Sequence, residues 1–235
     1  MKSIDPAERG ETIQDAALAV PVWDLPIRMF HWSLVALIAF SWWSAENQRI
    51  EWHLWSGYAV LFALLFRIFW GFAGSSTARF SNFVTGPRGV VAYLHRARDW
   101  RRVGHTPLGA LSVVALLTLL LAQVGFGLLL SDEDGLVSAP LNHLVGFETA
   151  ELAHDVHQAL FNGLLGFIIL HVSVILFYHL LRNKPLTGAM INGSARHLPG
   201  AEPLVPASPK RLVACLVMAV LLTAWVIAGL PPIGT

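Results

Sequence analysis

Residues 157–182 read HQALFNGLLGFIILHVSVILFYHLLR, an apolar stretch whose only Lys or Arg is its last residue. About 20 such residues are enough to cross the core of a bilayer, so the pattern predicts a membrane-spanning helix over Val156–Leu181. His157 and His171 lie 14 residues apart. At 100° per residue they return to within about 40° of one helical face, about 21 Å apart along the axis. This helix therefore offers two histidines at two depths.

The composition excludes most soluble classes of protein. Of 235 residues, 55% are hydrophobic and only 13% are charged, whereas a soluble domain carries about a quarter charged residues. An ordinary water-soluble enzyme, a disordered chain and a collagen-like fibre are excluded. The single Cys215 excludes a disulfide framework, a zinc ribbon and a cysteine-ligated iron–sulfur cluster. The question that remains is why so apolar a chain contains 10 histidines.

Four further apolar stretches bring the expected number of spans to five. We expect an all-α membrane protein, a four-helix transmembrane bundle with a fifth transmembrane helix. We expect the chain to divide into four parts: a cytoplasmic extension (1–27), the core (28–182), a cytoplasmic connection (183–211), and a last helix with a short periplasmic tail (212–235). The other four predicted spans are Arg28–Ser44, Trp52–Phe72, Pro107–Leu130 and Leu212–Leu230.

Charge placement predicts the orientation. Every lysine and arginine except Arg49 and Arg67 lies before the first span, at its first residue, or in the connections 74–106 and 182–211. The stretch Ser131–Asp155 is acidic and has no Lys or Arg. Basic connections stay in the cytoplasm, so we expect a multi-pass protein of the bacterial inner membrane. Its N-terminus would be cytoplasmic and its C-terminus periplasmic.

The histidines fall into two levels on this topology. His53 begins the second span near the periplasmic side, level with His157, and His31 begins the first span near the cytoplasmic side, level with His171. Paired histidines on facing helices suit bis-imidazole ligation of haem iron. Without a C-x-x-C-H motif the haems would be two noncovalent haems b. The alternative is that each histidine only hydrogen-bonds a neighbouring helix.

Other residues have expected supporting roles. Gly57, Gly125 and Gly127 would give a macrocycle room. Three arginines on the cytoplasmic side would pair with haem propionates: Arg28, Arg67 and Arg79. His179 is expected to cap a helix or contact a propionate. Surface or solvated positions are expected for His95, His105, His143, His154 and His197. Interfacial anchors are expected at Trp32, Trp42, Trp43, Trp52, Trp55, Trp70 and Trp100.

Five segments of the chain follow a familiar pattern: VWDLPIRMFHW (22–32), RIFWGFAGSSTARFSNFVTGP (67–87), GHTPLGAL (104–111), SDEDG (131–135) and residues 157–196. With these segments the chain resembles the prokaryotic cytochrome b-561 and Ni,Fe-hydrogenase b-type cytochrome family. The resemblance spans residues 21–195 and implies a four-helix diheme core with iron ligands His31, His53, His157 and His171. It also implies two partners, a membrane quinone and a periplasmic redox protein. The short turn at 45–51 makes a hydrogenase partner less expected, and GHTPLGAL favours a c-type cytochrome.

The leading hypothesis is electron transfer across the membrane between quinone and a periplasmic c-type cytochrome. Quinone would react on the cytoplasmic side, near His31, Arg28 and Arg67. The acidic segment Asp132–Asp155 would dock a lysine-rich partner or simply stay solvated. Alternatives are a superoxide:quinone oxidoreductase, a membrane subunit of a hydrogenase or dehydrogenase, and a transporter using histidine for metal or protons. The basic connections would equally suit anionic lipid. Whether the chain is an enzyme and how it oligomerises are left open, and no nucleic-acid partner is expected.

Overall fold

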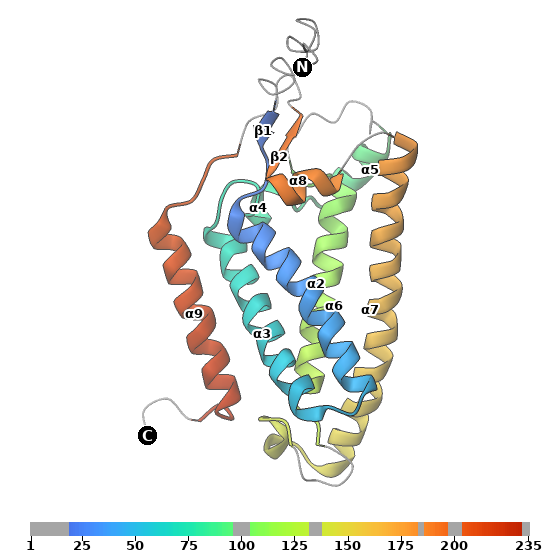
Figure 1. Cartoon of the computed structure of the whole chain (residues 1–235), viewed down its shortest axis with the longest axis vertical. Coiled ribbons are helices and arrows are strands. Elements are labelled where there is room, and N and C mark those ends of the chain that lie inside the picture. Colours follow the sequence, from blue (N-terminus) through green and yellow to red (C-terminus); the bar gives the residue numbers. More distant parts are fainter. Residues whose placement is uncertain (1–18, 96–103, 132–137, 183–185, 197–203, 232–235) are drawn as a thin grey trace, which may run out of the picture.

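The computed structural model describes residues 19–95, 104–131, 138–182, 186–196 and 204–231. Figure 1 shows a bundle of long helices with short elements at both ends. In the described part of the chain, five helices are long and apolar enough to cross a membrane. They are α2 (Leu25–Glu46), α3 (Ile50–Ala73), α6 (Pro107–Gly127), α7 (Phe147–Arg182) and α9 (Pro209–Ile227). The expected all-α membrane fold with five spans is confirmed.

The helix starts follow local sequence signals. Asp24 caps α2, because its carboxylate accepts a hydrogen bond from the Ile27 amide at 2.9 Å. Thr106 caps α6 in the same way through the Gly109 amide at 3.1 Å, with Pro107 in the first helical position. Helix α7 begins at Phe147, nine residues before the predicted start. Its 36 residues measure about 54 Å, so its first turns extend beyond a bilayer core of about 30 Å.

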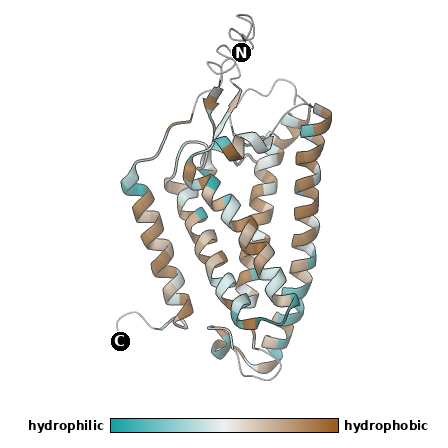
Figure 2. Cartoon of the chain, viewed as in Figure 1, coloured by the Kyte–Doolittle hydropathy of each residue, from teal (hydrophilic) through white to brown (hydrophobic). Residues whose placement is uncertain are grey.

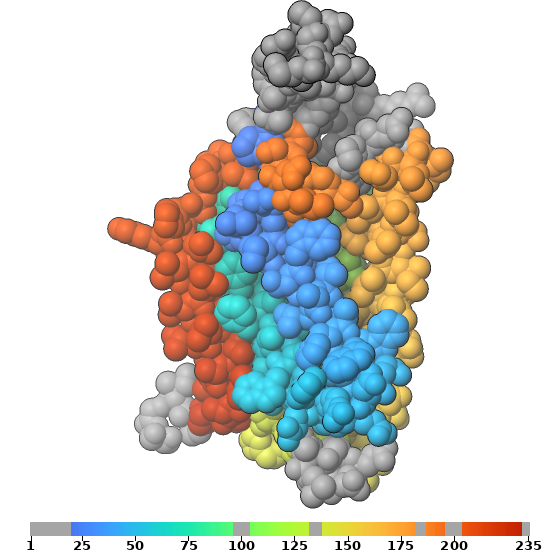
Figure 3. Space-filling model, viewed as in Figure 1, coloured from blue at the N-terminus to red at the C-terminus, as the bar shows by residue number. Residues whose placement is uncertain are grey.

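The helices pack as two hairpins. Helix α2 lies against α3, α6 lies against α7, and α3 joins the hairpins through α6. Neither α2 nor α3 approaches the α7 backbone as closely as α6 does. Helix α9 lies on the outside of α3, as the red helix of Figures 1 and 3 shows. Brown, apolar residues cover most of the helices in Figure 2, and teal residues gather toward their ends, as expected for a protein surrounded by lipid.

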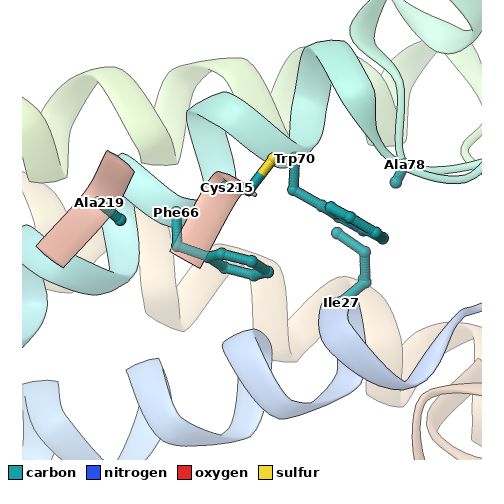
Figure 4. Packing of buried hydrophobic residues seen from close by; sticks show 6 residues of the cluster. All are labelled: Ile27, Phe66, Trp70, Ala78, Cys215 and Ala219. Carbon is teal, nitrogen blue, oxygen red and sulfur yellow. The ribbon is translucent and has the colours of Figure 1, made fainter. Parts of the chain in front are cut away.

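Helix α9 is anchored to α3 by small residues. Cys215 and Ala219 of α9 pack against Phe66 and Trp70 of α3, with Ile27 of α2 beside them (Figure 4). Ala219 is fully buried. Small side chains let two helices approach closely, and such contacts drive helix association in lipid. The fifth helix therefore belongs to the folded unit.

The two ends of the bundle differ. We call the end with the strands β1 (Ala19–Pro21) and β2 (Ser194–Arg196) and the helix α8 (Leu186–Asn192) the sheet end. The short helices α4 (Phe80–Phe83) and α5 (Pro87–His95) also lie there (Figure 1). The opposite end is the loop end. It carries the α2–α3 turn, the 3-10 helix η2 (Asn142–Leu144) and the start of α7.

One glycine is required at the sheet end. Gly193 joins α8 to β2 with a positive φ of 84°, a conformation that side chains rarely adopt. Its carbonyl accepts the amides of Val22 and Trp23, and a Cβ would lie 3.2 Å from the Arg28 guanidinium carbon. The glycine thus lets the chain before α2 pair with the chain after α8.

Candidate functional site

The four histidines of interest lie on three helices at two levels. His31 is on α2, His53 is on α3, and His157 and His171 are on α7. His53 and His157 are near the loop end. His31 lies in the second turn of α2, toward the sheet end, on the level of His171. The two levels are separated by about 21 Å along α7.

The loop-end histidines face each other. The ring centroids of His53 and His157 are 6.1 Å apart, and the ring planes are inclined by 82°. Bonds from one metal to two imidazole nitrogens, at about 2 Å each, place the ring centroids about 6 Å apart. The spacing therefore fits two imidazoles that would hold one metal ion between them.

Both loop-end imidazoles have an Nδ1 contact to a backbone carbonyl of a neighbouring helix. The Nδ1 atom of His53 lies 2.9 Å from the carbonyl oxygen of Ser41 on α2. That of His157 lies 2.8 Å from the carbonyl oxygen of Gln123 on α6. Since a carbonyl only accepts, Nδ1 is the protonated, donating nitrogen in each ring, and Nε2 keeps its lone pair. This is the arrangement that orients histidine as a metal ligand.

Helix α6 shapes the position of His157 in two further ways. The side-chain amide of Gln123 lies 3.1 Å from His157 Nε2, where it donates to the lone pair. One turn later, a Cβ on Gly127 would lie only 2.9 Å from Cε1 of His157. The predicted role of Gly127, giving room to a macrocycle, is therefore corrected: the space at this glycine is taken by His157.

The sheet-end pair is held differently. His31 and His171 lie close enough to interact electrostatically. Within the described residues, neither ring has a hydrogen-bond partner, and the buried Nδ1 of His31 is without an acceptor. The edge of the His31 ring meets Trp32 with 5.0 Å between centroids. The structure thus shows a ring contact for the predicted loop-end pair, whereas the predicted sheet-end pair has only an electrostatic interaction and no hydrogen bond among the described residues.

One glycine leaves open space next to His53. A Cβ on the half-buried Gly57, one turn after His53, would meet no atom within 4 Å. Gly125 also has an open Cβ position, but it is exposed, so that space lies on the outside of α6. In the described ranges no three His, Cys, Asp or Glu residues come together as metal ligands. Each level thus offers an ion two protein ligands. Iron in a macrocycle needs only two axial ligands from the protein, so these residues fit a haem.

The three predicted arginines lie at the sheet end with buried nitrogens that lack acceptors. Arg28 donates to the Ile191 carbonyl at the end of α8, while its Nε has no partner. Arg67 is only 3% exposed. Its guanidinium lies 4.6 Å from the centre of the Phe80 ring, and one terminal nitrogen has no partner. Nε of Arg79 is likewise unpartnered. Such donors fit a group with acidic or carbonyl oxygens.

Two sequence predictions at this end are wrong. His105 is not a surface residue, because its ring lies between Trp23 and Phe83, each at 4.5 Å between centroids. Burial, with a smaller contribution from Arg67, lowers the pKa of His105 to about 3. Trp70 is not an interfacial anchor. It is 2% exposed, and its indole N–H donates to the Asp24 carboxylate at 2.9 Å.

The remaining predicted positions are simpler. His95, His143, His154 and His179 are exposed. His197, Trp100 and the acidic residues Asp132, Glu133 and Asp134 lie outside the described residues. Sequence reasoning missed Ser41 and Gln123 altogether. For Gln123, the one available signal is a polar side chain in an otherwise apolar span, four residues before Gly127.

The comparisons with known proteins agree with the fold. The sequence profile of the prokaryotic cytochrome b561 family matches residues 22–193. This range begins just before α2, includes all four histidines, and ends at the glycine after α8. No curated protein and no solved structure matches the chain.

Proposed function

Because this chain belongs to the prokaryotic cytochrome b561 family, it is a membrane b-type cytochrome that takes part in electron transfer. On that premise we propose that it binds two noncovalent haems b and carries electrons across the membrane, between quinone and a periplasmic redox protein. The observation that supports two haems best is the presence of paired imidazoles at two depths, with the loop-end rings 6.1 Å apart.

In this proposal His53 and His157 hold one iron, and His31 and His171 hold the other. The bound irons supply one-electron chemistry between the ferric and ferrous states. The carbonyls of Ser41 and Gln123 fix the loop-end rings so that their Nε2 atoms would be the coordinating atoms. The Gln123 side-chain amide, which lies 3.1 Å from His157 Nε2, would have to turn away when iron binds there. The apolar helix faces around both levels exclude water from the sites.

The sheet end is the proposed cytoplasmic side and the place where quinone reacts. The described parts of the basic connections lie at this end, in agreement with the positive-inside rule. Buried nitrogens of Arg28, Arg67 and Arg79 have no acceptor within the described structure. Haem propionates and quinone carbonyl oxygens are both acceptors of the kind these nitrogens need. The three arginines therefore bind and orient oxygen-bearing groups here.

The loop end is the proposed docking face for a basic, soluble c-type cytochrome. The described part of this end exposes one arginine, Arg49, and five carboxylates: Glu46, Glu51, Glu148, Glu151 and Asp155. A negatively charged face raises the association rate of a positively charged protein. The same charges repel a small anion, so the surface supports a basic partner better than superoxide as the substrate.

The haem content of the purified full-length protein tests this proposal. We expect a reduced-minus-oxidised visible spectrum with a b-type α-band, and two extractable haems per chain. A protein purified from haem-replete membranes without that band would overturn the haem assignment. One haem per chain would overturn the two-level assignment.

A further inference from the structure

Helix α9 lies outside the range that the family profile matches, which ends at residue 193, yet it contacts the part of the bundle that carries the sheet-end pair. We infer that α9 is a positioning element for the sheet-end site, acting on the first turns of α2 through Trp70 and Asp24. The inference rests on the proposed function, because it concerns how His31 is held for the iron there. It adds a role for the fifth helix.

The segment that leads into α9 is tied to the sheet end by backbone hydrogen bonds. The Leu204 amide donates to the Pro21 carbonyl at 3.3 Å, in the chain just before α2. Ser76, in the turn after α3, donates its amide to the Val205 carbonyl at 3.0 Å, and its hydroxyl accepts the Val205 amide at 2.8 Å. Helix α9 begins shortly afterwards, at Pro209. Its start is therefore fixed relative to both α2 and α3.

Helix α9 then packs on the residues of α3 that lead to α2. Cys215 and Ala219 are 4% and 0% exposed and lie against Trp70 and Phe66 (Figure 4). Ile27, in the first turn of α2, belongs to the same cluster. Protein interiors are packed about as densely as crystals of small organic molecules, so a shift of one member moves its neighbours. The position of α9 therefore constrains the Trp70 ring.

Trp70 connects this cluster to the cap of α2. Its indole N–H donates to Oδ2 of Asp24 at 2.9 Å. The other carboxylate oxygen, Oδ1, accepts the Ile27 amide at 2.9 Å and so caps the helix. Hydrogen bonds to an ionised acceptor are stronger than neutral ones, and Arg67 of α3 also lies close enough to Asp24 to interact with it electrostatically. One carboxylate thus holds the start of α2 against the end of α3.

The first turns of α2 carry groups of the sheet-end site. Arg28 directly follows Ile27, and His31 comes one turn after Ile27. The His31 ring has no hydrogen-bond partner in the described part of the chain, so its placement depends on the placement of α2. The loop-end rings of His53 and His157 are each held by a carbonyl instead. A change at α9 should therefore alter the sheet-end pair and leave the loop-end pair in place.

The test uses the oxidised full-length holoprotein and two measurements. Electron paramagnetic resonance records the low-spin ferric signals, whose positions depend on how the two axial rings are oriented. The sheet-end signal is the one that His171→Ala removes, and the loop-end signal is the one that His157→Ala removes. The second measurement is the rate at which a membrane-permeant maleimide labels Cys215, the one cysteine of the chain. Because Cys215 is buried between α9 and α3, its labelling reports whether α9 is in place without depending on haem.

Ala219→Leu should displace α9, because the fully buried Ala219 leaves no space for a larger side chain. We expect Cys215 to be labelled several-fold faster and the sheet-end signal to shift or disappear, while the loop-end signal stays unchanged. Ala214→Leu is the matched control, since it makes the same change on the exposed face of α9. It should change neither the labelling rate nor either signal.

Trp70→Phe and Asp24→Asn break the connection between α9 and α2 from its two sides. Phenylalanine keeps an aromatic ring but has no N–H to donate, and asparagine keeps only one acceptor oxygen of the two. Each variant should shift the sheet-end signal while Cys215 stays protected, because α9 itself remains docked. The double variant should shift the signal no further than the single ones, since both remove the same hydrogen bond.

An unchanged sheet-end signal in Ala219→Leu overturns the inference, and so does an equal change of both signals. If Ala219→Leu does not accumulate in the membrane, Trp70→Phe and Asp24→Asn decide. Additive shifts in the double variant, no shift in either single variant, or a shift of the loop-end signal then overturn the inference. All these outcomes leave the two-haem proposal intact, whereas a wild type without haem is the failure of the proposed function itself.

Discussion

At the loop end, His53 and His157 each donate a hydrogen bond to a backbone carbonyl, whereas at the sheet end His31 and His171 have no partner among the described residues. Both pairs share helix α7, so the difference comes from the neighbouring helices. At the loop end, α2 and α6 present carbonyl oxygens to the rings. At the sheet end, buried nitrogens of arginine and histidine instead lack acceptors. The protein alone orients the histidine rings at the loop end. The sheet end instead has donor nitrogens that suit a ligand with oxygen acceptors.

The largest effect should come from removing one pair at a time. His157→Ala should lose the loop-end haem and His171→Ala the sheet-end haem, so that each purified variant retains about half of the wild-type haem per chain. The pyridine haemochrome assay measures this ratio. His154→Ala is the matched control, because His154 is exposed on α7 one turn before His157. Equal haem loss in the control, or loss of the same haem from both variants, would contradict the two-level assignment.

The pairing of the histidines was within reach of the sequence because it depends on helix geometry. The rotation and rise per residue place His157 and His171 on one face of α7, and the antiparallel order of the spans places His53 and His31 at matching depths. The expected fold follows from the same apolar spans, and it is confirmed by five helices.

The supporting residues were out of reach because they depend on how one helix is positioned against another. A carbonyl acceptor such as that of Ser41 has no side-chain signal, since every residue carries one. His105 and Trp70 were misread because a connection or a helix end suggests exposure. In the structure, the chain returns over the end of α3, so that Trp23, Asp24 and Phe83 enclose both residues.

Acid should expose a second difference between the two ends, because the sheet end contains a histidine that the fold keeps neutral. The pKa of His105 is about 3 in the folded protein and 6.5 is its ordinary value. Below pH 6.5 the unfolded chain therefore binds a proton that the folded chain does not, and stability falls as the pH decreases toward 3. At pH 5 this amounts to about 2 kcal/mol.

His105→Phe should remove this loss. Thermal unfolding of the detergent-solubilised protein at pH 7.5 and pH 5 measures it, as a smaller decrease in Tm for the variant than for the wild type. His95→Phe replaces an exposed histidine at the end of α5. The Tm of this variant should decrease between pH 7.5 and pH 5 by as much as the Tm of the wild type. If His105→Phe loses as much stability at pH 5 as the wild type, His105 is not the acid-sensitive group.

The smallest effect should come from neutralising exposed carboxylates at the loop end, away from the two histidine pairs. Glu148, Glu151 and Asp155 are exposed on the first turns of α7, where an exposed ion pair contributes about 0.2–1 kcal/mol. Replacing them with Gln, Gln and Asn should slow electron exchange with a basic c-type cytochrome several-fold at low ionic strength. Stopped-flow mixing should show the difference shrinking as salt rises, because charges about 10 Å apart are screened at about 0.1 M. Lys210→Gln, at the exposed sheet-end start of α9, is the control and should leave the rate unchanged. A faster rate for Lys210→Gln, which makes the net charge more negative, would mean that net charge matters and that the loop end is no more a docking face than the sheet end.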